Sequence, residues 1–475
     1  MKEKTELKFL SHASATISCG GKTLIMDPWL IGSCYWRSWW NYPPVADDLL
    51  ANLKVDAIYL THVHWDHWHG PTLKKMFPKD TLIITHDEPN KRSVNDLKAI
   101  GFKNLKTLKH GESFTLGDIR ITPYQFGIFL NDSAVVVETP SLNLLNANDC
   151  KIAGSSLRQI IKKYGTFDFA LRSHSTANDR VCYSVENEVV KFDDTDHYSK
   201  AFSLFMNAVK PRFAVPFASN HCHLHKDVIS MNDFINDPFK LREFLEHSNA
   251  LKGSELKIML SGDSWSSENG FDINGENAKY FINKERHIAE YQKVVQPKLT
   301  SYYALENKML PNERIIEMFE GQINSIPKIL RLGFGKFEYK MVLFTKETEL
   351  AFRVNVKNGV VKKCGFDNES GALVRIPAKI FIDAVMLNMF HHSSISKRIQ
   401  FKFTNIENMR KYEKFHKLLE YVELEVFPLN IKYLFRLGSS YTRRWRELMV
   451  YIKALVLLKR GHAIYEIEEE ILKNT

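Results

Sequence analysis

Cysteine is scarce and scattered in this sequence: the 475 residues include six cysteines, and no two of them form a Cys-x-x-Cys pair. Their spacing excludes a zinc ribbon and a regular disulfide framework, so a reducing compartment is expected. Met1–Leu7 lacks the apolar stretch that begins an export signal, and the most apolar segments, Phe381–Phe390 and Leu448–Leu458, are too short or too interrupted by charge to cross a bilayer. We therefore expect a folded, cytoplasmic protein that does not span a membrane.

The sequence also lacks an even distribution of charge. Its formal net charge is +10, and most of the excess falls in one C-terminal segment, where eight basic residues accompany the single acid Glu447. The basic residues are Lys432, Arg436, Arg443, Arg444, Arg446, Lys453, Lys459 and Arg460. Such a stretch is either a solvated helix face or a contact surface for anionic lipid or another polyanion, with nucleic acid the less favoured partner.

The length of the chain predicts at least two hydrophobic cores. Residues 1–297 alternate strand-like and helix-like segments, which predicts an α/β domain that ends where the helical stretch Lys284–Val295 should break at Pro297. Residues 311–428 predict a smaller α+β domain, and residues 429–475 predict a basic helical tail. In the smaller domain we expect helices at Arg314–Ile323 and Ile380–Met389 and strands at Lys336–Phe344, Leu350–Val356 and Val360–Phe366.

Several predicted strands of the first domain end in polar residues. Val55–Leu60 precedes a histidine-rich segment, Leu142–Asn146 precedes Asp149, Phe167–Arg172 precedes His174, and Arg212–Pro216 precedes three clustered histidines. Loops at one edge of a rigid sheet are where α/β proteins commonly build sites. We therefore expect these side chains to converge.

The histidine-rich segment, His62-Val63-His64-Trp65-Asp66-His67, has the form H-x-H-x-D-H. Two imidazoles two residues apart on extended backbone point the same way and can hold one cation, while Asp66 and His67 can reach a second. Imidazole and carboxylate ligands suit Zn²⁺, Fe²⁺ or Mn²⁺, and two such ions can hold a hydroxide between them. The alternative is a histidine-rich surface loop that binds no metal.

This motif, together with Ser11-His12-Ala13-Ser14 in the first hairpin and Asp27-Pro28-Trp29-Leu30 after the next strand, resembles the metallo-β-lactamase superfamily. Further segments resemble the lactamase-like domain of the CMP-N-acetylneuraminate hydroxylases, notably Trp39-Trp40, Pro71-Thr72-Leu73, Leu145 to Cys150 and Pro216-Phe217-Ala218. The similarity spans about residues 6 to 265. It implies an αββα sandwich in the first domain.

The resemblance also implies a ligand set for two divalent ions, with Zn²⁺ favoured over Fe or Mn. His62 and His64 would bind the first metal, Asp66 and His67 the second, and Asp149 would touch both. His225 follows Pro-Phe-Ala and is expected as a further ligand of the second metal, with His221 and His223 as competitors. Asp66 and His174 are the expected catalytic residues.

One departure from the family pattern concerns the first metal. Family hydrolases usually supply a third histidine from the loop that here is Gln125–Ser133, and this loop contains none. Asn131, Asp132 or His174 would have to replace it, or the site holds a single metal. His174 is otherwise an acid/base residue facing the substrate or a hydrogen-bonded loop histidine.

In the C-terminal part, Arg375-Ile376-Pro377 followed by Ile380 to Ala384 resembles a sterol-carrier-type domain, which would enclose an apolar cavity. The alternative is an ordinary small domain packed against the first.

Three functions remain open from the sequence. The first is a hydrolase that uses a metal-bound hydroxide on an ester, phosphoester, lactone or amide. Its substrate would be a small and anionic molecule, such as a sugar or nucleotide-sugar derivative. The second is an iron-dependent oxygenase, which would need a separate electron donor, because a Rieske cluster requires a Cys-x-His pair and the sequence has none. The third is a binding protein with a degenerate metal site.

Overall fold

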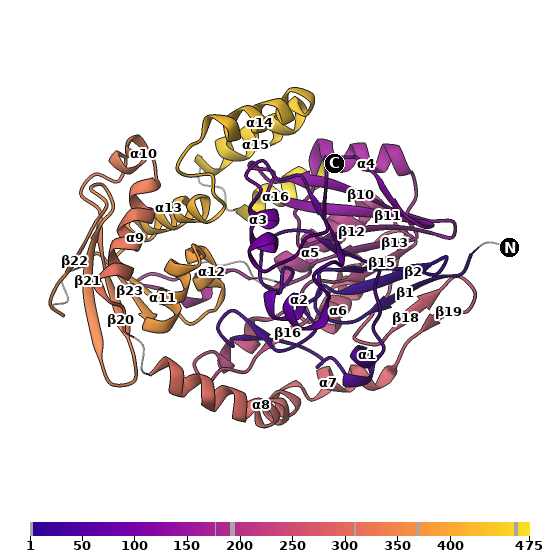
Figure 1. The fold of residues 1–475 in the computed structure, drawn as a ribbon, viewed down its shortest axis with the longest axis horizontal. Helices are drawn as coiled ribbons and strands as arrows, with labels where there is room; N and C mark the ends of the chain where they lie inside the picture. The colour runs from indigo at the N-terminus through magenta and orange to yellow at the C-terminus, as the bar shows by residue number, and fades with distance from the viewer. Residues whose placement is uncertain (1–2, 176, 191–194, 308–309, 367–369, 460–463) are drawn as a thin grey trace.

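Two β-sheets packed face to face form the first half of the chain in the computed structural model, which describes residues 3–175, 177–190, 195–307, 310–366, 370–459 and 464–475 (Figure 1). In spatial order, the first sheet consists of β19 (Gly270–Asp272), β18 (Ser264–Ser266), β1 (Thr5–Phe9), β2 (Ala15–Cys19), β3 (Lys22–Met26), β6 (Ala57–Leu60), β7 (Leu82–His86) and β8 (Leu105–Leu108). The second consists of β17 (Glu255–Leu256), β15 (Phe213–Pro216), β13 (Phe169–Arg172), β12 (Leu142–Asn148), β11 (Asp132–Thr139), β10 (Ile119–Phe126) and β9 (Phe114–Leu116).

Helices cover the outer faces of both sheets. Residues of α2 (Gly70–Met76) and α3 (Arg92–Ala99) share a core with the first sheet, and residues of α4 (Gly154–Tyr164), α5 (Thr195–Val209) and α6 (Pro238–Ser248) share one with the second. The strands are apolar on both faces for this reason: Val135 and Val137 of β11 lie in the core between the sheets, while Ala134 and Val136 lie in the core under the helices. This confirms the expected αββα sandwich.

The second half of the chain contains a separate six-stranded sheet. Its order is β14 (Tyr183–Val185), β24 (Gln400–Phe403), β23 (Ala372–Pro377), β20 (Glu338–Phe344), β21 (Glu349–Asn355) and β22 (Val360–Lys363). The helices of this domain are α9 (Glu313–Ser325), α10 (Lys328–Leu332), α11 (Ala378–Met386), α12 (Phe390–Ile395) and α13 (Ile406–Glu423). The smaller α+β domain is therefore present as expected, but β14, from the first half of the sequence, pairs parallel with β24 and joins the two halves.

The helix break expected at Pro297 is wrong. Helix α8 (Lys284–Glu306) runs through this proline and connects the two domains along one side of the molecule (Figure 1). A proline removes one helical hydrogen bond. Here Ile288, Val295 and Leu299 of α8 pack against a cluster from the first domain that includes Trp40 and Leu224, and this burial holds the helix together on both sides of Pro297.

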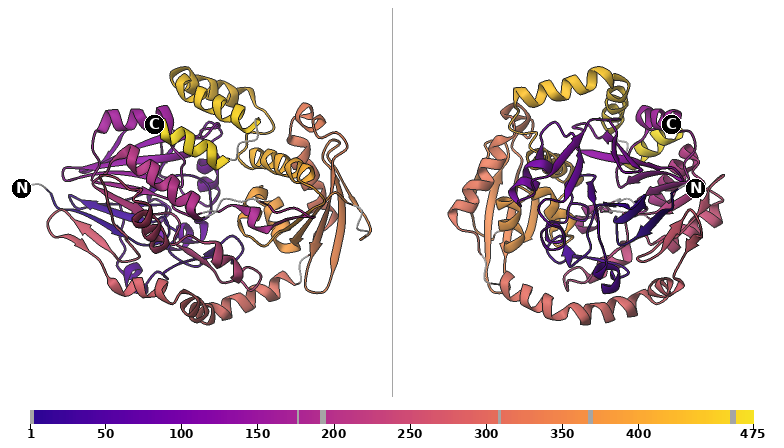
Figure 2. Two further views of the ribbon diagram at one scale, coloured as in Figure 1. Left: turned by 180° about the vertical axis from the view of Figure 1, so that it is seen from behind. Right: turned by 45° about the vertical axis from the view of Figure 1, so that its right-hand side comes forward.

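The expected helical tail comprises α14 (Ile431–Arg443), α15 (Trp445–Lys459) and α16 (Ile464–Lys473). Leu472 of α16 is buried in the core beneath the second sheet, which fixes the end of the chain to the first domain. Helices α14 and α15 form a hairpin that projects from the edge of the molecule (Figure 2). Arg460, counted in the basic stretch, lies outside the described residues. Among those that are described, no helix combines the length and the apolar character needed to cross a bilayer.

Candidate metal centre

The loop between β6 and α2 carries the H-x-H-x-D-H motif, and Asp27 anchors it. Asp27 follows β3 with a positive φ of 42° and is fully buried. Its carboxylate accepts hydrogen bonds from the backbone N–H of Thr61 at 2.9 Å and from the hydroxyl of Thr61 at 2.7 Å. The loop therefore starts from a fixed point at the sheet edge.

A first group of ligand-type side chains consists of His62, His64 and Asp149, whose ligand atoms lie within 4.8 Å of one another. His62 Nε2 is 2.8 Å from His64 Nδ1 and 3.6 Å from Asp149 Oδ2. The structure thus brings the three residues expected at the first metal into one place.

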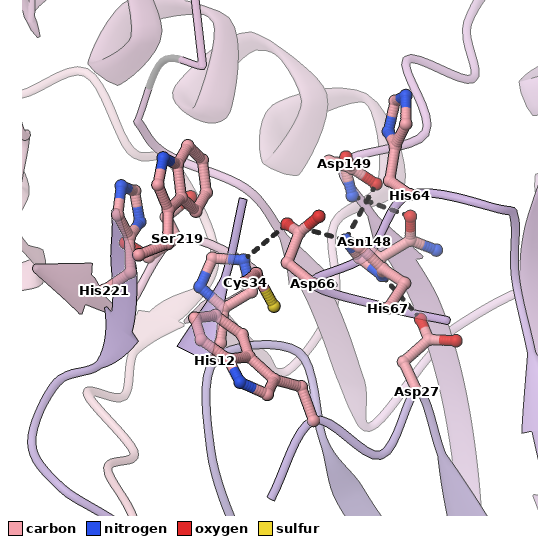
Figure 3. A network of polar contacts seen from close by, with 12 residues as sticks. His12, Asp27, Cys34, His64, Asp66, His67, Asn148, Asp149, Ser219 and His221 are labelled. Carbon is pink, nitrogen blue, oxygen red and sulfur yellow. Dashed lines mark hydrogen bonds and ion pairs between the residues drawn. The ribbon is translucent and has the colours of Figure 1, made fainter. Parts of the chain in front are cut away.

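A second group consists of His12, Asp66 and His67, again within 4.8 Å of one another (Figure 3). His12 Nε2 is 3.1 Å, and His67 Nε2 is 3.6 Å, from Asp66 Oδ2. The other oxygen of Asp66 accepts a hydrogen bond from the Tyr35 hydroxyl at 2.5 Å. His67 Nδ1 donates to Asp27 at 2.7 Å, which leaves Nε2 as the ligand atom, in the manner of a carboxylate that orients a metal-binding histidine.

Asp149 lies between the two groups. It follows β12, where Asn148 has a φ of 42° and its side-chain oxygen accepts from the N–H of Asp149 at 2.7 Å. Asp149 Oδ1 is 3.4 Å from His67 Nε2, while Oδ2 faces His62. His67 Nε2 and Asp149 Oδ1 are buried and have no hydrogen-bond partner among the described residues. Unsatisfied buried polar atoms are costly, so this donor set fits divalent cations bound at both groups.

The electrostatics of the site follow from this crowding of opposite charges. Burial opposes a charge on His67, but the carboxylates of Asp149, Asp66 and Asp27 together raise its pKa to about 10. Burial likewise disfavours the carboxylate form of Asp66, yet His67 and His12 hold its pKa well below the usual range. The carboxylates of the site therefore favour positive charge near the ligand atoms.

The expected ligand His225 is in neither group. Its Nε2 lies 3.5 Å from Glu306 of α8, and its Nδ1 lies 3.5 Å from Asp227. The reason is a third, small sheet, in which β16 (His221–His223) pairs antiparallel with β5 (Trp39–Asn41), beside β4 (Ser33–Cys34). His225 lies beyond the end of β16, on the side of α8. His12 stands in the second group instead, and the only signal for it in the sequence was its place in the Ser11–Ser14 hairpin segment of the family resemblance.

The other candidate histidines surround the centre without joining either group. His221 stacks on Trp39 at 3.6 Å between ring centroids and lies 5.5 Å from the His12 ring, while His223 meets Trp39 edge-on. His174 is fully buried, and burial together with the nearby His12 lowers its pKa to about 3. Among the suggested replacements for the missing histidine, Asp132 lies 3.6 Å from His62 Nδ1.

The second domain also reaches the centre, through His392 of α12. Its ring lies 5.1 Å from the ring of His64 and 5.4 Å from that of Trp65. Its Nδ1 is bound to the carboxylate of Glu423, at the end of α13, and its buried Nε2 has no hydrogen-bond partner among the described residues. No sequence motif marks His392, because the contact depends on how two domains pack.

The loop between β4 and β5 joins the metal centre to the second domain. Tyr35, Trp36 and Arg37 all have positive φ, at 48°, 56° and 65°, a conformation that costs non-glycine residues on the order of 1–3 kcal/mol each. Contacts at both ends offset this cost: Tyr35 bonds Asp66, and the indole N–H of Trp36 donates to Asp383 of α11 at 2.9 Å.

Comparison with known proteins finds a family match for the part of the chain that carries His12 and the H-x-H-x-D-H motif. Residues 6–127 match the profile described as Beta-lactamase superfamily domain. Cytidine monophosphate-N-acetylneuraminic acid hydroxylase from Mus musculus is 29% identical over 153 residues, which is 31% of this chain and 26% of that protein. The chain therefore aligns with about a quarter of the length of this curated relative.

Solved structures with a similar arrangement include an isothiocyanate hydrolase from Delia radicum gut bacteria, with 19% identity, 55% of this chain and 98% of that chain covered, and a TM-score of 0.40. CmlA, a diiron beta-hydroxylase from Streptomyces venezuelae, has 15% identity, covers 56% of this chain and 54% of its own, and has a TM-score of 0.38. The matched residues 6–127 form part of this two-sheet domain, and this part of the chain is similar to the metallo-β-lactamase superfamily.

Proposed function

We propose that the chain is a metal-dependent hydrolase that holds two divalent cations, with Zn²⁺ as the favoured ion. The observation that carries the proposal is the position of Asp149, with one carboxylate oxygen toward His62 and the other toward His67. His62 and His64 would hold one ion, His12, Asp66 and His67 the other, and Asp149 would be shared. When bound, two such cations polarise the substrate and lower the pKa of water toward neutrality, so that no serine or cysteine nucleophile is needed.

The surrounding side chains fix these ligands in place. The Tyr35 hydroxyl holds one oxygen of Asp66 and leaves the other for the ion, while Asp27 fixes the tautomer of His67. In this assignment Asp66, expected as a catalytic residue, acts as a ligand. A preorganised set of this kind reduces the reorganisation that the reaction requires.

His392 is the side chain best placed to handle a proton. Glu423 holds its Nδ1, so that Nε2 can give a proton to a leaving group or accept one from water. In this assignment His392 takes the acid/base role first expected of His174. A substrate with an ester, phosphoester, lactone or amide bond suits this arrangement, and the nucleotide sugar in the name of the curated relatives supports a sugar or nucleotide-sugar derivative.

The test is metal analysis of protein purified without added metal, combined with hydrolysis of p-nitrophenyl esters and bis-p-nitrophenyl phosphate. We expect about two equivalents of zinc and measurable hydrolysis. His64→Ala and Asp66→Ala should lose activity while melting like metal-free wild type. Full activity in both variants would overturn the proposal, and a folded protein that takes up no metal would instead favour a binding protein.

An iron-dependent oxygenase is the second candidate, and a specific observation favours it. Each group of ligands contains two histidines and one carboxylate, which is the donor set of non-haem Fe²⁺ oxygenases. The curated relatives are also named hydroxylases. This reaction needs electrons from a separate donor. Iron in place of zinc, and oxygen consumption upon addition of a reductant and an amino-sugar substrate, would favour it over hydrolysis.

A further inference from the structure

The outward face of the α14–α15 hairpin exposes large apolar side chains. Phe435 and Trp445 are 73% and 59% exposed. Other exposed apolar residues of the hairpin are Ile431, Leu434, Met449, Ile452, Leu455, Val456 and Leu458. So many large exposed apolar side chains on one short hairpin indicate an interaction surface rather than ordinary protein surface.

On α15 these residues have a helical spacing. Trp445, Met449, Ile452 and Val456 are separated by four, three and four positions, which puts them on one stripe. The opposite side of the helix is already occupied: Glu447 accepts a hydrogen bond from Ser156 of α4 at 2.6 Å, and Leu457 is buried. The helix is therefore apolar on a second face that nothing in the described structure covers.

The exposed charged side chains of the hairpin itself have one sign. Lys432, Arg443, Arg446 and Lys453 are exposed, and the Arg446 guanidinium lies over the Trp445 ring at 5.5 Å. Lys453 also pairs with Glu470 of α16 at 2.7 Å. The one acid of the hairpin, Glu447, is buried against Arg444 at 2.6 Å. Aromatic and aliphatic side chains flanked by basic ones are the composition of a helix that lies in the interface of an anionic membrane.

We propose that the outward face of α14 and α15 docks on the surface of a membrane that contains anionic lipid. A second copy of the chain fits less well, because a symmetric contact would bring the same basic residues of both copies together. The inner side of the hairpin is held firmly: Arg444 donates to the backbone oxygen of Gln125 at 2.6 Å, and Tyr441 to that of Ile128 at 2.9 Å. The hairpin therefore docks together with the metal-binding domain.

The experiment is cosedimentation of the full chain with vesicles of phosphatidylcholine, alone or mixed with phosphatidylserine. We expect binding to the mixed vesicles that weakens with salt. The double variant Phe435→Ser, Trp445→Ser should bind on the order of tenfold more weakly or worse. Lys432→Glu with Arg446→Glu should remove the preference for anionic vesicles.

The matched control is Val294→Ser with Ile329→Ser, which removes two apolar side chains that are each 76% exposed outside the hairpin. This variant should bind like wild type, and metal content and circular dichroism should be the same in all four proteins. Absence of binding by wild type, or equal binding by all variants, would overturn the proposal. A wild-type dimer that the Phe435, Trp445 variant converts to monomer, without vesicle binding, would assign the face to a second copy instead.

Discussion

Asp149 Oδ1 lies 3.4 Å from His67 Nε2, and neither atom has a hydrogen-bond partner among the described residues. Both atoms are buried, and a bound cation would satisfy them where no protein group does. Because the second oxygen of Asp149 faces His62, this one side chain relates the two groups of ligands. The two-metal assignment therefore rests on it more than on any other residue.

Asp149→Asn should reduce the bound metal from about two equivalents to about one or fewer, because the amide keeps the shape of the side chain but loses its charge. Activity should fall by at least the roughly 10- to 100-fold that loss of an outer partner of a metal ligand costs. The metal content is measured by mass spectrometry of the purified protein. Asp168→Asn, which changes an aspartate that accepts a hydrogen bond from the N–H of Asn143 near the other end of β12, is the control and should keep its metal.

His12→Ala should weaken binding of the second cation, whereas His225→Ala should leave both cations bound. His12 Nε2 lies 3.1 Å from Asp66, while His225 is engaged with Glu306 and Asp227. Competition titration against a chromogenic chelator measures both affinities. The reverse outcome, loss of metal in the His225 variant alone, would restore His225 as the ligand and exclude His12.

Glu88, just before the start of α3, should make the free energy of unfolding depend on pH independently of metal binding. It is 2% exposed and accepts two hydrogen bonds from Ser93, yet burial raises its pKa from 4.5 to about 7. The folded protein therefore holds a proton that the unfolded chain has lost between about pH 4.5 and about pH 7, so stability falls as the pH rises through this interval. The contribution is about 3 kcal/mol.

Urea unfolding of wild type and Glu88→Gln at the two ends of this interval measures the effect. The variant should lose most of the difference, since its side chain does not titrate. Glu276→Gln, at an exposed glutamate paired with Lys279, should keep the wild-type dependence. An unchanged pH dependence in the Glu88 variant would contradict the assignment.

The sequence predicted what depends on local pattern. The helix expected at Arg314–Ile323 is present within α9, and the strand before His62 ends at Leu60, where its apolar run ends. The H-x-H-x-D-H motif predicted that His62 and His64 would lie together and Asp66 with His67, and the structure groups them in this way, since local backbone geometry fixes their directions.

What failed depends on packing between distant segments. His225 was expected as a ligand because the family resemblance has a histidine after Pro-Phe-Ala, but the pairing of β16 with β5 turns the chain toward α8 before that histidine is reached. Pro297 was expected to end the helix because proline removes a helical hydrogen bond, yet burial of Ile288, Val295 and Leu299 outweighs this loss. His12 and His392 reach the centre through the sandwich and the domain interface, which leave no short-range signal.

His392→Gln should lower kcat by roughly 10²- to 10⁴-fold, the usual contribution of an acid/base residue, while the metal content stays at the wild-type value. Glu423→Gln should have a smaller effect in the same direction, because His392 would keep its ring but lose the carboxylate that orients it. The control is His391→Gln, at the neighbouring histidine that lies 3.5 Å from Glu420 and stacks on His416, away from the centre. The pH profile of kcat distinguishes the roles: a proton-transfer residue takes one limb of the profile with it, whereas a merely structural one scales the whole profile. Loss of metal from the His392 variant would show instead that this side chain holds the first cation, and the acid/base assignment would fall.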